Sequence, residues 1–518
     1  MVTQESLWEE YQRGLSFKEG LGLFETVRNN ENFYIGKQWE GVQAGGLPTP
    51  VFNFIRRIVL YLVASTAADR IKLNATPLGG GEEAEELCRV VNGQFERLFE
   101  DNRVGLLVRE FTRNAAVDGD GCLYSYFDPD YDGGGGLGGI RTELVENTRV
   151  FFGNPNDRRV EGQPYLILSR RETVDKLSRR AAAYGGEGEI LPDGEDELEA
   201  PQPGQRRCTV LHRFWKEEKT GTVWACECTR TAVVRPPWDT RQKRYPIVWL
   251  PWDYVQDCYH GQAAVTGLIP NQIFVNKLFA MTMLSLMTTA YPKVIYDKSR
   301  IGRWDARVGT AIGVSGGDMG SVARTLDPAA ISPQVPQFIQ LAISLTKEFM
   351  GATDAALGTV RPDNTSAILA LQKASGVPME LFRQNLYQCL EDLGRIWLDI
   401  MRLHYGKRWM TQGEEKRGFD FGALERFPVA LKLDVGGSAY WSEIAQLNTL
   451  DNLLAGGKID VVDYLERIPN GYIADQAGLI ETLKARREGR SLPQAREAEN
   501  TAPEAEEKED EDGKGERT

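Results

Sequence analysis

One pattern in this sequence is typical of a catalytic serine. Gly313, Ser315 and Gly317 fit the G-x-S-x-G turn, which holds a nucleophilic serine between a strand and a helix and needs acid and histidine partners. A strand before Ser315 is plausible, but the glycines after it disfavour a helix, and His404 is the only histidine downstream. A tight hairpin turn explains the glycines better. A serine hydrolase that uses Ser315 is therefore the weaker alternative.

Two further patterns suggest metal or redox chemistry. Residues 118–121 read Asp-Gly-Asp-Gly, but the later oxygen ligands and the glutamate of an EF-hand are missing, so we expect a turn into a strand. Cys226 and Cys228 form a C-x-C pair whose side chains would share one face of a strand. We interpret the pair as part of an apolar β-face, with a metal or redox role as the alternative. The three histidines have no ligand spacing, and we predict no catalytic residue, metal or cofactor.

Length and charge set the class of protein. A chain of 518 residues is too long for one core, so several domains are expected. The formal charge is −13, whereas a protein that grips DNA by its phosphates normally has a basic excess. A negative surface still suits a protein past which DNA slides. Seven scattered cysteines indicate reduced thiols in a cytosolic setting.

No membrane segment is predicted. The N-terminal residues are polar and of mixed charge, unlike a signal peptide. The most apolar run, 278–291, is shorter than the roughly 20 residues that a spanning helix needs. We expect this run to be a buried or inter-subunit helix.

The elements around these patterns are organised about residues 336–406, which predict a helix, a short polar loop and a long second helix. The apolar residues of the second helix recur every three or four positions, as expected for one buried face; they are Met379, Phe382, Leu386, Leu390, Leu393, Trp397, Ile400 and Leu403. Gly376 and Pro378 should kink or break this helix near its start. A glycine-rich, β-like stretch, 292–327, lies between an apolar helix at 262–290 and the helix at 336–350.

The remaining pattern is mixed α and β. Helices are expected at 5–36, from Asn53, at 82–101 and 106–117, and strands at 122–127, 140–143, 150–152, 165–170, 208–216, 222–230 and 246–250. Gly267 and Pro270 predict an irregular start to the apolar helix. The polar residues 185–207 should be a mobile surface loop, and three short helices should follow a strand within 426–436. The tail from Ser491 carries ten acidic and four basic residues and should be disordered.

In this order, the parts resemble the portal proteins of tailed bacteriophages. The segments that carry the resemblance are NFYIGKQWEG…LPTPVFNFIRRIV, VFFGNPNDRRVEGQPYLILSRR, GLIPNQIFVNKL and NTSAILALQK. The resemblance covers roughly residues 5–490. It implies an α+β portal fold that assembles into a ring, usually of twelve subunits in such proteins, at one capsid vertex. Another ring-forming phage structural protein is the alternative.

The resemblance also implies a part for each segment. Residues 1–258 and 406–440 correspond to the wing, 259–290 and 333–355 to two stem helices, 291–332 to the clip, 356–365 to the tunnel loop, 366–405 to a long kinked helix, 441–490 to the crown and 491–518 to a disordered acidic tail. The implied DNA-facing residues of the tunnel loop are Thr359, Arg361, Pro362, Asp363, Asn364 and Thr365. Arg361 is the only basic residue of that loop and contacts either DNA or an acid of a neighbouring subunit.

The implied partners are those of a packaging channel. Arg303, Trp304 and Arg307 of the clip would dock partners, although both arginines could equally be solvated turn charges. The expected partners are other copies of the chain, the terminase large subunit, head–tail adaptor or connector proteins, the major capsid and scaffolding proteins, and double-stranded DNA held non-specifically. The expected location is the portal vertex of the virion, with the host cytoplasm during assembly.

Overall fold

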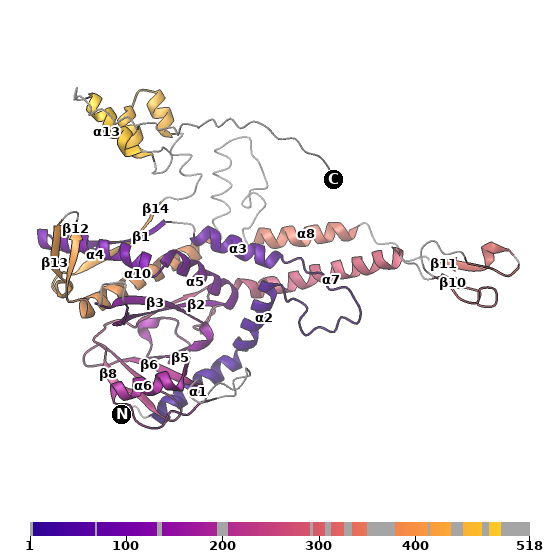
Figure 1. The fold of residues 1–518 in the computed structure, drawn as a ribbon, viewed down its shortest axis with the longest axis horizontal. Helices are drawn as coiled ribbons and strands as arrows, with labels where there is room; N and C mark the ends of the chain where they lie inside the picture. The colour runs from indigo at the N-terminus through magenta and orange to yellow at the C-terminus, as the bar shows by residue number, and fades with distance from the viewer. Residues whose placement is uncertain are drawn as a thin grey trace, which may run out of the picture. The chain divides into compact units, whose positions relative to one another are not determined.

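The computed structural model describes residues 4–67, 70–131, 137–193, 206–290, 294–305, 312–316, 318–325, 334–349, 379–412, 415–436, 449–468 and 476–487. They belong to two compact units, Met1–Gly436 and Gly437–Thr518. The first unit has the mixed α and β composition that the sequence predicts (Figure 1). Its described helices are α1 (Gln4–Gly20), α2 (Leu23–Ile35), α3 (Phe54–Ala67), α4 (Glu82–Asp101), α5 (Val104–Asp118), α6 (Val174–Tyr184), α7 (Ala264–Ala290), α8 (Gln334–Phe349) and α10 (Glu380–His404).

The described strands form five antiparallel sheets, all in the first unit. Three are pairs: β1 (Arg70–Pro77) with β14 (Val429–Gly436), β10 (Val294–Tyr296) with β11 (Ala323–Thr325), and β12 (Lys407–Gln412) with β13 (Glu415–Asp420). A three-stranded sheet has the order β3 (Gly139–Val145), β2 (Asp120–Asp128), β9 (Ile247–Pro251). A five-stranded sheet has the order β4 (Val150–Phe152), β5 (Tyr165–Thr173), β6 (Arg207–Lys216), β7 (Val223–Cys228), β8 (Val233–Asp239).

The main core forms around α10, as its apolar period predicts. The predicted apolar residues from Met379 to Ile400 are buried, and Leu403 is half-buried. Trp397 is fully buried, lies edge-on to Phe99, and donates its Nε1 hydrogen to Thr142 Oγ1 at 3.0 Å. The helix packs against β2, β9 and β14 (Figure 1). The predicted kink at Gly376 and Pro378 lies outside the described residues.

A second core lies between the two larger sheets. Cys122 and Trp249 of the three-stranded sheet pack with Leu166, Leu168 and Phe214 of the five-stranded sheet. On the opposite face of the five-stranded sheet, Ile167 and Leu211 pack under α1. This alternation is the period of two that strands require. Cys226 and Cys228 both lie in the cluster under α1, so the prediction that the pair shares an apolar β-face is confirmed.

Several elements differ from the predictions. β8 was not predicted because it contains Pro236 and Pro237, residues tolerated only at a sheet edge, which is where β8 lies. The predicted mobile loop 185–207 is wrong for its first part, since residues 185–193 bridge to β8 at Glu187 and bury Ile190. Helix α6 and strand β1 were also missed. Each owes its stability to a tertiary neighbour: α6 packs on β8, and β1 pairs with β14.

The second unit is helical where it is described. Residues 449–455 are helical, followed by α12 (Val461–Arg467) and α13 (Gln476–Arg487), as the sequence predicts. Asp460 caps α12 by accepting a hydrogen bond from the Val461 N–H at 2.7 Å. Lys484 of α13 pairs with Glu466 of α12. The acidic tail lies outside the described residues.

Candidate functional site

Only two of the predicted site residues, Arg303 and Trp304, are among the residues that the structure describes. Arg303 and Trp304 lie between β10 and β11, where Arg303 is exposed and the Trp304 ring stacks on Tyr296 with centroids 5.6 Å apart. The other predicted site residues lie outside the described residues; they are Arg307, Thr359, Arg361, Pro362, Asp363, Asn364 and Thr365. Their roles stay predictions.

The serine pattern does not form a nucleophile elbow. Ser315 is exposed in a loop, and its N–H donates to the Arg300 carbonyl at 3.4 Å. The three histidines have other partners: His212 contacts Glu227, His260 contacts Asp120, and His404 stacks on Phe127. Within the described residues there is likewise no cluster of three or more His, Cys, Asp or Glu side chains that could hold a metal ion.

The candidate site is the helix pair α7 and α8. The two helices run antiparallel, with α7 leading into β10 and α8 returning after β11 (Figure 1). Asn271 near the start of α7 donates to Thr346 near the end of α8, with Nδ2 and Oγ1 3.1 Å apart. The predicted irregular start of α7 is wrong, because the helix runs unbroken through Gly267 and Pro270. Its first turns are fixed to the core by buried Val265, Leu268 and Ile269.

A chain of buried amides fixes the root of α7. The Gln272 side chain, which is fully buried, donates to the Phe52 carbonyl at 2.9 Å and to Asn276 Oδ1 at 2.9 Å. Asn276 in turn donates to Gln38 Oε1 at 2.6 Å, and Gln38 donates to the Phe33 carbonyl at 3.0 Å. Gln38 belongs to the NFYIGKQWEG segment, and Gln272 and Asn276 belong to the GLIPNQIFVNKL segment. The sequence singled out both segments but gave no signal that their amides bond to one another.

The Asp-Gly-Asp-Gly turn fixes the segment that enters α7. Asp120 is fully buried and accepts hydrogen bonds from His260 Nδ1 and from the Gly261 N–H, both at 2.7 Å. Gly119 has φ +100°, and a Cβ there would lie 2.7 Å from the Gly261 carbonyl oxygen, so the turn needs a glycine. Burial lowers the pKa of His260, although the nearby Asp120 opposes this. The predicted turn into a strand is confirmed, since β2 begins at Asp120.

Beyond its root, the helix pair presents apolar side chains to solvent. From residue 281 to residue 289 every side chain of α7 is exposed or half-buried. We call the exposed large apolar side chains of the pair the α7–α8 apolar face; they are Phe274, Met281, Met283, Leu284, Leu286 and Met287 of α7 with Phe338, Leu341 and Leu345 of α8. Lys277 is the only charged residue in the sequence of α7. A surface so rich in exposed large apolar side chains and so poor in charge is a mark of an interaction site.

The tip between the two helices has a small core of its own. β10 and β11 pair over three residues each, and Ile301 and Val322 are buried beside them. Asp297 is held by an Asx-type turn, in which its Oδ1 accepts from the Ser299 N–H at 2.9 Å. The described residues of 294–325 are otherwise exposed or half-buried, so this segment is not packed inside the main core.

Comparison with known proteins identifies the family. A model of the phage P22-like portal protein family matches residues 166–415, which run from β5 to the start of β13 and include α7, the tip and α8. Over residues 166–415 the chain matches the phage P22-like portal protein family. This family consists of structural, non-enzymatic phage proteins of the virion. No curated protein matches the chain.

The family match bears on the earlier predictions. The resemblance to phage portal proteins and the structural, non-enzymatic class are confirmed. The matched range is a little less than half of the chain and leaves out α1–α5 and the second unit. Among the helices that the structure describes, not one combines the length and the apolar character that crossing a membrane requires.

Proposed function

We propose that this protein assembles into a ring of twelve copies at one vertex of a phage capsid. The ring would be the channel for DNA packaging and ejection. The observation that carries the proposal is the α7–α8 apolar face, which the rest of the described chain leaves uncovered. A contact repeated by rotation closes a ring, and in it each apolar face would be covered by the neighbouring copy.

The proposed parts follow the order of the chain. We assign α7 and α8 to the stem, the segment with β10 and β11 to the clip, the two larger sheets with α10 to the wing, and α12 and α13 to the crown. The tunnel loop at 356–365 would approach DNA through Arg361. The clip, with Arg303, Trp304 and Arg307, would dock the terminase large subunit and later the head–tail adaptor proteins. Exposure of Arg303 supports that role.

Charge supports a conduit through which DNA slides. Twelve copies would carry 12 × −13 = −156 charges. Such a ring repels the phosphate backbone on average, so contacts with DNA would be weak and non-specific. Deletion of residues 357–365 should leave ring assembly intact and impair packaging or retention of DNA. Unimpaired packaging would refute the assignment of the tunnel loop.

Negative-stain imaging of the purified chain tests the proposal. We expect rings with a central hole wide enough for duplex DNA. A chain that stays monomeric at high protein concentration would contradict ring assembly. Replacement of Arg303 by Glu should disturb motor docking more than ring formation, and normal motor binding by this variant would contradict the role of the clip.

A further inference from the structure

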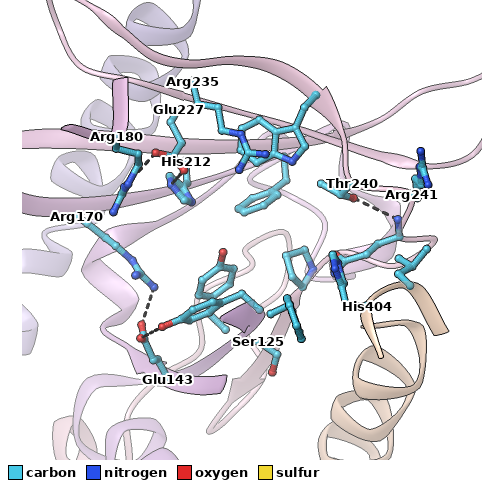
Figure 2. Close-up of a pocket in the computed structure, with 18 of the residues that line it drawn as sticks. Ser125, Glu143, Arg170, Arg180, His212, Glu227, Arg235, Thr240, Arg241 and His404 are labelled. Atoms are coloured by element: carbon cyan, nitrogen blue, oxygen red, sulfur yellow. Dashed lines mark hydrogen bonds and ion pairs between the residues drawn. The ribbon is translucent and has the colours of Figure 1, made fainter. Parts of the chain in front are cut away.

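A separate cavity lies in the first unit, away from the α7–α8 apolar face. It has a volume of about 710 Å³ and opens between the two larger sheets, near α6 and the last turn of α10 (Figure 2). This volume falls within the range of pockets that hold small molecules. Strands β2, β3, β5, β6, β7 and β8 all contribute side chains to it. No part of the proposed portal role uses this cavity.

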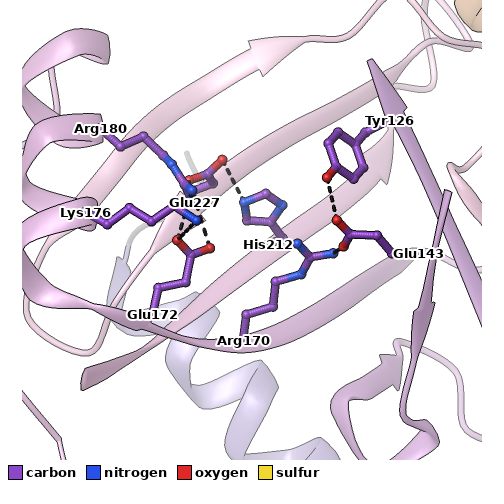
Figure 3. Close-up of polar contacts among 8 residues, drawn as sticks. All are labelled: Tyr126, Glu143, Arg170, Glu172, Lys176, Arg180, His212 and Glu227. Atoms are coloured by element: carbon purple, nitrogen blue, oxygen red, sulfur yellow. Dashed lines mark hydrogen bonds and ion pairs between the residues drawn. The ribbon is translucent and has the colours of Figure 1, made fainter. Parts of the chain in front are cut away.

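The carboxylates that line the cavity are already paired. Glu227 accepts from His212 Nε2 at 2.7 Å and from Arg180 Nη1 at 3.0 Å (Figure 3). Burial alone would raise the pKa of Glu227, but these two contacts outweigh it and lower the pKa to about 2. Arg180 also reaches Glu172, at 3.0 Å. These acids therefore have little capacity left to accept bonds from a ligand.

A third acid of the lining, Glu143, is also paired. Glu143 accepts from Arg170 Nη2 at 2.9 Å and from the Tyr126 hydroxyl (Figure 3). The lining carries five basic side chains, Arg170, Lys176, Arg180, Arg235 and Arg241, against four acidic ones, Glu143, Glu172, Glu227 and Asp239. The lining thus has one basic side chain more than it has acidic ones, within a chain whose net charge is −13.

Arg235 is the donor best prepared for a ligand. Its Cζ lies 3.6 Å from the centre of the Trp238 ring and 4.1 Å from that of Tyr184, so its guanidinium is stacked between two rings. No carboxylate pairs with Arg235 among the residues that the structure describes. Stacking occupies the faces of a guanidinium and leaves the N–H groups at its edge free to bind an anion.

The walls of the cavity are flat and aromatic. Tyr124, Phe214 and Trp238 line it together with the stacked rings of Phe127 and His404, whose centroids are 4.6 Å apart. Aromatic walls favour a planar ligand, which they hold by stacking and by burial of apolar area. Arginine edges beside such walls suit a molecule that is both flat and negatively charged.

We propose that this cavity binds a small planar anion, namely an aromatic ring that bears a phosphate or a carboxylate. The anionic group lies at the edge of Arg235, and the ring lies against the aromatic walls beside Trp238. The site is built entirely from the first unit, so binding does not depend on ring assembly. Failure of the portal proposal and failure of this one are therefore distinguishable.

Isothermal titration of the full chain tests the proposal with deoxyadenosine monophosphate and salicylate as probes. We expect saturable binding of at least one probe at one site per chain. Deoxyadenosine, which lacks the anionic group, and inorganic phosphate, which lacks the ring, should bind more weakly. If deoxyadenosine alone or inorganic phosphate alone binds as tightly as the best probe, the requirement for both groups is overturned. The absence of saturable binding by either probe would also overturn the proposal.

Variants locate the site. Arg235→Ala should weaken binding about tenfold, because a charge-assisted hydrogen bond is lost. Arg235→Lys keeps the charge but loses the planar stack, so it should weaken binding as well and guards against misfolding of the alanine variant. Arg89→Ala, at an exposed position on α4, is the matched control and should bind normally. Equal affinity of Arg235→Ala and the unaltered chain, or equal weakening by Arg89→Ala, would contradict the assignment.

Discussion

The α7–α8 pair and the two-sheet body of the first unit differ in which side chains they expose to solvent. The body buries even its charged groups when they have partners: Lys18 is fully buried and donates to the carbonyls of Asn147 at 2.7 Å and Val150 at 2.6 Å. The helix pair leaves large side chains such as Met281 and Leu286 more than half exposed. A self-sufficient body beside an uncovered apolar face indicates that the face is completed by another molecule.

The largest expected effect is loss of assembly when the apolar face is charged. Leu286→Asp combined with Leu341→Asp should convert rings into single chains, because a carboxylate cannot be buried unpaired at an apolar contact. Light scattering after size-exclusion chromatography measures the particle mass. Leu106→Asp is the matched control, since Leu106 on α5 is 51% exposed and Leu341 is 52% exposed. Rings formed by the double variant would contradict the claim that the α7–α8 apolar face is covered by other copies of the chain.

A substitution in the core of the body should lower the stability of the fold, whereas a substitution in the apolar face should affect assembly. Trp397→Ala removes the side chain at the centre of the main core and should lower the free energy of unfolding by about 3–5 kcal/mol. The Leu286→Asp variant should leave the unfolding of the body nearly unchanged. Chemical denaturation followed by tryptophan fluorescence compares the two. An equal loss of stability in both variants would contradict the expectation that the α7–α8 apolar face contributes little to the folding of the body.

The amide chain at the root of α7 links the two regions and has a smaller expected effect. Asn276→Ala leaves the buried Gln38 Oε1 without its donor, which costs about 1–3 kcal/mol. Hydrogen exchange should show faster opening of the first turns of α7 while α10 keeps its protection. Replacing exposed Lys277 by Ala is the control. Unchanged exchange in Asn276→Ala would mean that the amides do not fix the helix.

The smallest effect is a pH dependence at the entry to α7. Burial lowers the pKa of His260 below 6.5, so the unfolded chain binds more protons at this residue than the folded chain does. The contribution to stability is therefore complete above 6.5 and is lost as the pH falls from 6.5 toward the folded pKa. The difference in unfolding free energy between the unaltered chain and His260→Gln isolates this residue from Asp118, whose pKa burial raises to about 7. A difference that does not change with pH would contradict this.

The sequence predicts what depends on period and local chemistry. The spacing of Leu386, Leu390 and Trp397 predicts the buried face of α10, and the expected strands at 165–170 and 208–216 fall within β5 and β6. What the sequence leaves open depends on partners distant in the chain. β1 is a strand because β14 lies beside it, and Gln38 bonds to Asn276 across 238 positions.

The candidate site was predicted in outline only. The apolar run 278–291 indicates a helix that needs a partner, and the structure leaves five of its large side chains exposed, from Met281 to Met287. Nothing in the local pattern of Arg235 or Glu227 indicates a shared cavity, because the residues that line it come from six strands and two helices. Composition gives the net charge of the chain, but it does not show which basic side chains line the same cavity.

Oxidation of methionines by dilute peroxide tests the central claim most directly. Met281, Met283 and Met287 are exposed on the single chain, whereas Met401 is fully buried and serves as the internal reference. In the assembled particle we predict that all three are protected nearly as well as Met401, and that they are oxidised rapidly in the Leu286→Asp, Leu341→Asp variant. Rapid oxidation of Met281, Met283 and Met287 in assembled particles would contradict the claim that other copies of the chain cover the α7–α8 apolar face.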